Sequence, residues 1–86
     1  MWEEIDNKLI RQFEFVDFNE AFGFITQIAL LAEKFQHHPT ITNTWNRVDI
    51  ALCTHEANNT VTSKDRTLAL EIDTVFSRYR HKYAIK

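Results

Sequence analysis

A hydrophobic period of two predicts a β-strand over residues 8–15. Leu9, Phe13 and Phe15 fall on one face of this segment, and Arg11 interrupts the pattern at the same parity. Successive side chains of a strand point to opposite faces of a sheet, so this spacing is typical of a strand with one buried face.

Two further extended segments, residues 41–46 and 48–55, predict an antiparallel hairpin that turns near Asn46 and Arg47. The second segment alternates cleanly between apolar and more polar or smaller residues. Its core-facing positions are Val48, Ile50 and Leu52.

Two segments show the helical period, and each begins with a capping pattern. Asp17 followed by Glu20 predicts the start of a helix over residues 17–36, because both side chains can pair with backbone amides of the first turn. Thr62 followed by Asp65 repeats this pattern before a final helix. One face of the final helix is traced by Leu68, Ile72, Val75 or Phe76, and Tyr79.

The order strand, helix, strand, strand, helix predicts an α+β fold in which helices cover one face of an antiparallel sheet. With 86 residues, the chain has enough material for one domain over residues 1–86. Three strands leave a sheet edge open, and open edges favour pairing with a second copy.

The helix predicted over residues 17–36 has two apolar stripes, and each needs a partner. One can face the sheet of the same domain. We expect the other to contact the same helix of a neighbouring subunit in a homodimer or homotetramer, with burial beneath a loop as the alternative. The stripes are Phe18, Phe22, Ile25, Ala29 and Ala32, and Phe24, Ile28 and Leu31.

Composition restricts the class of protein. At 44% hydrophobic and 26% charged residues, the chain is typical of globular proteins. The formal net charge of −2 disfavours direct binding of nucleic acid, which needs a basic face. No apolar run is long enough to span a membrane, and no apolar leader begins the chain. A single cysteine, Cys53, cannot form an internal disulfide, so we expect a cytoplasmic location.

Three of the four histidines lie at positions that neither the period of two of the strands nor the helical period explains. His37 and His38 are adjacent near the end of the predicted helix, and His55 follows the last strand. Imidazole both donates and accepts protons near neutral pH, so these residues are candidates for acid/base chemistry. We expect Glu33, four positions before His37, to orient its ring, and Trp45 to form a flat wall for an aromatic ligand.

Other roles for these histidines are compatible with the sequence. Two histidines at a helix C-terminus complement the helix dipole, and a lone histidine is usually a surface or satisfied core residue. A zinc site of His37, His38 and His55 is disfavoured, because the usual ligand spacings and a second cysteine are absent.

Taken together, these residues resemble the signature of the pterin-4a-carbinolamine dehydratase family. The signature has a glutamate, three residues, His-His-Pro, five residues, an aromatic residue, nine residues, a histidine, and a later aspartate. In this chain its members are Glu33, His37, His38, Pro39, Trp45, His55 and Asp65. The flanking sequences are also similar, so the resemblance covers nearly the whole chain.

The resemblance implies a dehydratase that needs no metal or bound cofactor. Such an enzyme removes water from 4a-hydroxytetrahydropterin and gives quinonoid dihydropterin, a step of tetrahydrobiopterin recycling. By resemblance, His37 and His55 carry the proton transfers and His38 orients the substrate. Glu33 positions His37. The pterin site is expected to be lined by Pro39, Thr54 and Glu56, with Asp65 nearby, where it also caps the last helix.

The sequence departs from the family in two informative places. Trp2 usually follows an N-terminal helix in the family, so we expect that helix to be missing from this chain. The loop after His55 lacks a glycine often present there and is slightly longer.

Some animal members of the family also act as dimerisation cofactors of a homeodomain transcription factor. A non-catalytic coactivator role with such a partner is therefore the alternative function.

Overall fold

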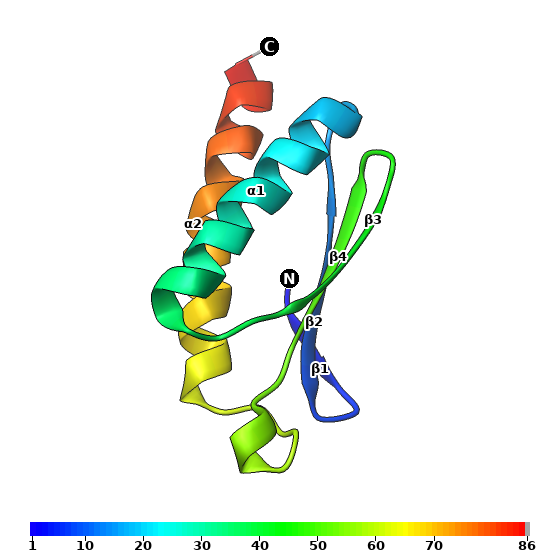
Figure 1. The fold of residues 1–86 in the computed structure, drawn as a ribbon. Helices are drawn as coiled ribbons and strands as arrows, with labels where there is room; N and C mark the ends of the chain where they lie inside the picture. Colours follow the sequence, from blue (N-terminus) through cyan, green and yellow to red (C-terminus); the bar gives the residue numbers. More distant parts are fainter. Residues whose placement is uncertain (86) are drawn as a thin grey trace.

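Two helices pack against one face of a four-stranded antiparallel sheet (Figure 1). The computed structural model describes residues 1–85, with the side chains of residues 1–79. The predicted α+β class, with helices on one face of the sheet, is confirmed. In chain order the elements are β1 (Glu3–Ile5), β2 (Lys8–Glu14), α1 (Phe18–Phe35), β3 (Thr40–Thr44), β4 (Arg47–Leu52), the 3₁₀ helix η1 (His55–Ala57) and α2 (Ser63–Ile85).

The sheet, in the order β1-β2-β4-β3, has one strand more than the hydrophobic pattern predicts. β1 pairs with β2 through a turn at Asp6 and Asn7, whose φ angles are 52° and 63°. Two successive positive φ angles give a hairpin the right-handed twist of its strands, and Asp and Asn tolerate this conformation. The three residues of β1 are all exposed, so they show no apolar alternation.

The β3–β4 hairpin turns at Trp45 and Asn46, one residue earlier than predicted, and Arg47 is the first residue of β4. The Phe15 amide donates to the Asn46 carbonyl oxygen at 2.9 Å, and Asn46 Nδ2 donates to the Phe15 carbonyl oxygen at 2.8 Å. These two bonds fix the turn against the end of β2. The predicted core side of β4 is confirmed by the burial of Val48, Ile50 and Leu52.

Asp17 caps α1 as the sequence predicts. Its backbone is extended, and its Oδ1 accepts a hydrogen bond from the Glu20 amide at 2.9 Å. This bond satisfies one of the four amides that a helix start leaves without an intrahelical acceptor.

Replacement of Asp17 by alanine is expected to lower the free energy of unfolding by about 1 kcal/mol, the usual cost of losing an N-cap. Urea denaturation followed by circular dichroism measures this change. Asn19→Ala, at an exposed position of the same first turn, is the control and should change stability by less than about 0.5 kcal/mol. Equal effects of the two changes would contradict the capping role.

α1 ends because Gln36 adopts a left-handed conformation with φ 52°, three residues before Pro39. The Gln36 amide donates to the Glu33 carbonyl oxygen at 3.2 Å, and the His37 amide donates to the Ala32 carbonyl oxygen at 3.1 Å. This pair of bonds is a Schellman motif. It turns the chain sharply before His37, and so directs that residue toward the start of α2.

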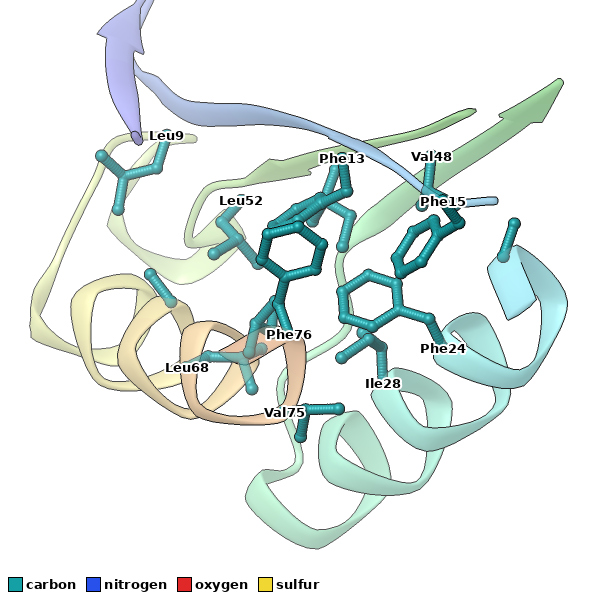
Figure 2. Close-up of a cluster of buried hydrophobic side chains, with 14 residues drawn as sticks. Leu9, Phe13, Phe15, Phe24, Ile28, Val48, Leu52, Leu68, Val75 and Phe76 are labelled. Carbon is teal, nitrogen blue, oxygen red and sulfur yellow. The ribbon is translucent and has the colours of Figure 1, made fainter. Parts of the chain in front are cut away.

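Aromatic side chains from three elements meet in the core (Figure 2). Phe13 of β2 lies 4.8 Å from Phe76 of α2 and 5.0 Å from Phe24 of α1, between ring centroids. Phe15 lies 4.9 Å from Phe24. The core therefore locks both helices onto the sheet.

One of the two apolar stripes of α1 faces the sheet, and the other does not. Phe24 and Ile28 are fully buried, as is nearly all of Ala32, which the pattern placed on the other stripe. Phe18 and Phe22 are 47% and 53% exposed, with ring centroids 5.7 Å apart. The contact predicted between this second stripe and a neighbouring subunit stays a prediction.

Candidate functional site

His37 forms a buried pair with Asp65. Its Nε2 lies 2.6 Å from Asp65 Oδ1, and 28 residues separate the two along the chain. The left-handed turn at Gln36 brings His37 in from the end of α1, and Asp65 comes from the first turn of α2. The pair therefore joins the two helices at the end of the sheet where η1 lies (Figure 1).

Asp65 is fully buried and is held by two threonines. Its Oδ2 accepts from the Thr54 hydroxyl and from the Thr62 amide, each at 2.8 Å. The Thr54 hydrogen is used in this bond, so in the 2.6 Å contact between the two hydroxyls Thr62 is the donor. The capping pattern predicted for Thr62 and Asp65 is present, and it also serves the pair with His37.

The network keeps Asp65 ionised. Burial alone raises the pKa of its carboxyl, but hydrogen bonds from His37, the Thr62 amide and the Thr54 hydroxyl outweigh burial and lower the pKa below its ordinary value of 3.8. A carboxylate only accepts hydrogen bonds, so the hydrogen between Asp65 and His37 belongs to Nε2 of His37. The Nδ1 of His37 is therefore its open nitrogen when the ring is neutral.

Glu33 pairs with His38, and the pairing with His37 that the sequence suggested is wrong. Glu33 Oε2 lies 2.8 Å from His38 Nε2, and both side chains are well exposed. The prediction assumed that the helix continues through His37, which would put positions four apart side by side. Because the left-handed Gln36 turns the chain first, the next histidine comes to lie against Glu33.

His55 is the first residue of η1, and its partner is Asn59. His55 Nδ1 lies 2.7 Å from Asn59 Oδ1, and both side chains are exposed. The loop that carries them is closed by a bridge between Thr54 and Thr60, in which the Thr54 amide donates to the Thr60 carbonyl oxygen at 2.8 Å.

His38 and His55 line one pocket, which we call the histidine pocket. It has a volume of about 320 Å³, at the lower end of the range for small-molecule sites. It lies on the sheet face opposite the helices, because its strand residues alternate with the buried residues of β2 and β4. Its lining includes Lys8, His38, Thr40, Cys53, His55 and Asn59.

His37 lines a separate hollow of about 180 Å³ together with Phe35, Ser63, Lys64 and Thr67. The structure therefore brings His38 and His55 together in one pocket and sets His37 in a different hollow. The adjacent residues 37 and 38 connect the two.

Glu56 lies near both His37 and His55. A hydrogen bond from its own backbone amide lowers the pKa of its carboxyl, and the positive charge of Lys64 lowers it further; burial opposes this, and the two histidines add smaller lowering effects. Both imidazoles are thus close enough to one exposed carboxylate to act on its ionisation. Thr54 and Glu56, predicted to lie at the site, do lie next to its histidines.

The structure does not bring Trp45 to the histidines. Trp45 is 63% exposed at the tip of the β3–β4 hairpin, at the opposite end of the sheet from η1 (Figure 1). Within one chain it therefore forms no wall of the histidine pocket. Pro39 is half-buried in the loop between His38 and the start of β3, where it fixes the backbone next to the pocket.

Among the residues that line the histidine pocket, sequence reasoning identified His38 and His55; those it missed include Lys8 and Asn59. Lys8 begins β2 and occupies an outward position of its alternation, which marks it only as solvent-facing. Asn59 follows Asn58 in a polar loop, and Asn-Asn is a signal for left-handed backbone, which both residues adopt with φ near 60°. That signal could have located the turn but not its contact with His55.

Two broader features of the described residues bear on function. Among their side chains, no group of three or more His, Cys, Asp or Glu residues is arranged to hold a metal ion. Neither α1 nor the described part of α2 combines the length and the apolar character that a membrane-spanning helix needs.

Comparison with known proteins places these residues in a family context. Residues 1–75 match the family described as Pterin 4 alpha carbinolamine dehydratase. A relative from Prochlorococcus marinus (strain MIT 9515), named as a pterin-4-alpha-carbinolamine dehydratase, is 46% identical over 77 residues, which are 90% of this chain and 79% of the relative. A relative of the same name from Paraburkholderia xenovorans (strain LB400) is 52% identical over 65 residues, covering 76% of this chain and 67% of the relative.

Solved structures show the same fold. A transcriptional coactivator/pterin dehydratase from Brucella melitensis superposes with a TM-score of 0.81 at 43% sequence identity, over 86% of this chain and 80% of the other. A pterin dehydratase-like protein identified as a RuBisCO assembly factor in the alpha-carboxysome superposes with a TM-score of 0.71 at 21% identity, over 87% and 86% of the two chains. The second likeness concerns the fold alone.

Proposed function

The chain belongs to the pterin 4 alpha carbinolamine dehydratase family, and from this premise we propose that it removes water from a 4a-hydroxytetrahydropterin to give the quinonoid dihydropterin. The observation that carries the proposal is the histidine pocket, in which His38 and His55 face one small-molecule-sized space. The names of the relatives support the same reaction.

The reaction needs one proton delivered and one removed. The C4a–O bond breaks, the leaving hydroxyl takes a proton to become water, and N5 loses its proton as the C4a=N5 double bond forms. No electrons are exchanged with another molecule. Imidazole groups are suited to both transfers near neutral pH, because the neutral ring accepts a proton and the protonated ring donates one.

The three histidines divide this work in our proposal. His55 and His37 transfer protons, and His38 orients the ligand in the histidine pocket. Support for His37 comes from its pair with the ionised Asp65, which stabilises positive charge on the ring when it takes a proton. Since His37 lines a different hollow, its part in the reaction requires a bicyclic ligand that extends from the pocket past residues 37 and 38.

Other predicted residues surround the ligand in the same proposal. Pro39, Thr54 and Glu56 border the two spaces through the backbone next to the histidines, and Asp65 acts through His37. Glu33 acts through His38 and does not position His37. Trp45 could contact the ligand only from a second copy of the chain.

A stopped-flow assay with authentic 4a-carbinolamine substrate tests the reaction. Purified protein at micromolar concentration should accelerate the dehydration well above its spontaneous rate, without added metal or cofactor. A rate equal to the spontaneous one would overturn the enzymatic proposal and would favour the second candidate function described below.

Glu33→Gln is expected to lower kcat/KM by no more than about fivefold at physiological salt, because exposed ion pairs contribute at most about 1 kcal/mol. The same assay measures this change. Lys34→Gln, a charge change at the neighbouring exposed position, is the control and should leave kcat/KM unchanged. A loss above tenfold for Glu33→Gln alone would mean that the carboxylate contacts the substrate directly.

A second candidate function is that of a non-catalytic adaptor, such as a dimerisation cofactor of a transcription factor. The exposed aromatic pair of Phe18 and Phe22 on α1 supports it, as does the coactivator name of the related Brucella protein. The same surface would serve assembly into a homodimer or homotetramer. An adaptor role is favoured if the purified protein does not accelerate dehydration and if His55→Ala leaves partner binding intact.

A further inference from the structure

We propose that Asn59 is a positioning residue for His55, and that it fixes Nε2 as the nitrogen of His55 that exchanges protons in the histidine pocket. The proposal rests on the proposed dehydration for its catalytic consequence. Its structural part, the choice of tautomer, is independent of the reaction.

The contact between the two side chains determines the tautomer. Asn59 Oδ1 lies 2.7 Å from His55 Nδ1, which is a short hydrogen bond. An amide oxygen is only an acceptor, so Nδ1 must carry the hydrogen. In the neutral ring this leaves the lone pair on Nε2. Free histidine prefers the opposite tautomer, so the bond to Asn59 changes which nitrogen of His55 is the base.

The loop holds Asn59 in place for this contact. Its amide donates to the Thr54 carbonyl oxygen at 3.0 Å, and the Asn58 amide donates to the His55 carbonyl oxygen at 3.1 Å. Asn59 has φ 59°, a conformation that few residues other than glycine, asparagine and aspartate adopt easily. Asparagine supplies both this backbone shape and a side-chain acceptor, whereas glycine would supply only the shape.

His55 and His37 are thus oriented in opposite ways by different partners. Asp65 is a charged acceptor on Nε2 of His37, and Asn59 is a neutral acceptor on Nδ1 of His55. The two rings therefore offer different nitrogens, Nδ1 and Nε2. A neutral acceptor orients the ring of His55 without adding negative charge beside it.

Several other groups also act on His55, and any pH profile will include them. Lys8 from β2, His38 from the loop after α1 and Cys53 at the end of β4 line the same pocket. Glu56 adjoins His55 within η1, and Lys64 of α2 lies near that carboxylate.

The test compares Asn59→Gly with Asn59→Asp in the full chain. Asn59→Gly keeps the left-handed backbone accessible and removes the acceptor; it should lower kcat by about two- to tenfold with little change in KM, as expected for one neutral hydrogen bond. Asn59→Asp keeps an acceptor of the same shape and adds charge. It should restore most of kcat and move the acidic limb of the pH–rate profile to higher pH, because the carboxylate favours the protonated ring.

Asn58→Gly is the matched control. Asn58 has the same left-handed conformation, with φ 61°, in the same loop, and it bonds to His55 only through its backbone amide. This variant should keep the wild-type rate and pH profile. An equal loss of kcat in Asn58→Gly and Asn59→Gly would assign the effect to loop rigidity and overturn the positioning role.

Nitrogen-15 NMR of the His55 ring separates this proposal from the dehydration itself. The neutral wild-type ring should show a protonated Nδ1 and an unprotonated Nε2, and Asn59→Gly should shift the ring toward the tautomer of free histidine. A protonated Nε2 in the wild-type protein would overturn the proposal even if the enzyme is active. The expected spectrum in a protein without dehydratase activity would instead remove the proposed function and leave the tautomer assignment standing.

Discussion

Replacing His55 with alanine is expected to lower kcat for carbinolamine dehydration by about 10²- to 10⁴-fold, the usual loss when a positioned proton-transfer group is removed. His55 is exposed, and the backbone bridge between Thr54 and Thr60 does not use its side chain. The fold should therefore persist, and the loss should appear in the rate alone.

The spontaneous dehydration limits the smallest catalysed rate that can be detected. Stopped-flow traces with and without protein are therefore compared at several protein concentrations. Gln12→Ala is a suitable control, because Gln12 is exposed farther along β2 and the histidine pocket does not include it. It should keep the wild-type rate. A His55→Ala protein within threefold of wild type would remove His55 from the proton transfers and leave His37 and His38 as candidates.

Burial on one face explains why most elements of the fold can be predicted from the sequence. The inward residues of β4, Val48 and Ile50, have almost no exposure. A strand with one face on the core needs an apolar residue at every second position, because successive side chains point to opposite faces. α2 shows the same constraint at the helical period, through Leu68 and Ile72. In each case the position in the core dictates the residue type, so the pattern identifies the element.

The hydrophobic pattern does not identify elements that lie outside the core. β1 is held by hydrogen bonds to β2 and has three exposed residues, so its side chains carry no period. The end of α1 depends on the left-handed backbone of Gln36, a residue that helices usually accept in their interior. Only the tertiary structure shows where such a residue leaves the helical conformation.

The sequence predicts candidate site residues but not the contacts between them. The family signature identifies His37, His55 and Asp65, yet it does not indicate that Asp65 binds His37 across 28 residues. The one contact inferred from local spacing, between Glu33 and His37, was wrong because the helix ends between them. Asn59 lies outside the signature, so its bond to His55 could be found only in three dimensions.

Asp65→Asn is expected to lower the free energy of unfolding by about 3–5 kcal/mol at pH 7, because it replaces a buried carboxylate that accepts three hydrogen bonds. The Asp65 oxygens accept from His37, the Thr54 hydroxyl and the Thr62 amide, and the new NH₂ group would face donors where an acceptor is needed. The free energy of unfolding of a small domain is about 5–15 kcal/mol, so this loss would leave the fold only marginally stable.

Thr62→Ala provides a graded comparison. It removes the hydroxyl that donates to Thr54 but keeps the backbone amide that donates to Asp65. The same hydroxyl accepts from the Lys64 amide at 3.3 Å, so the expected cost is about 1–2 kcal/mol, that of two hydrogen bonds. Urea denaturation of both variants therefore separates loss of the carboxylate from loosening of its surroundings. Equal costs for the two would mean that the charge of Asp65 adds nothing to stability.

The pH dependence of stability tests the same carboxylate by a second route. The pKa of Asp65 is lower in the folded protein than its ordinary value of 3.8, so between these two values the unfolded chain binds more protons. The contribution of Asp65 to the free energy of unfolding is thus fully present above pH 3.8, and it is lost as the pH falls through the pKa of the folded state. Asparagine does not titrate, so the Asp65→Asn protein should lose less stability than wild type between about pH 4 and pH 2. Parallel acid-denaturation curves for the two proteins would mean that Asp65 has the same pKa folded and unfolded, and that its hydrogen bonds do not favour the ionised carboxylate.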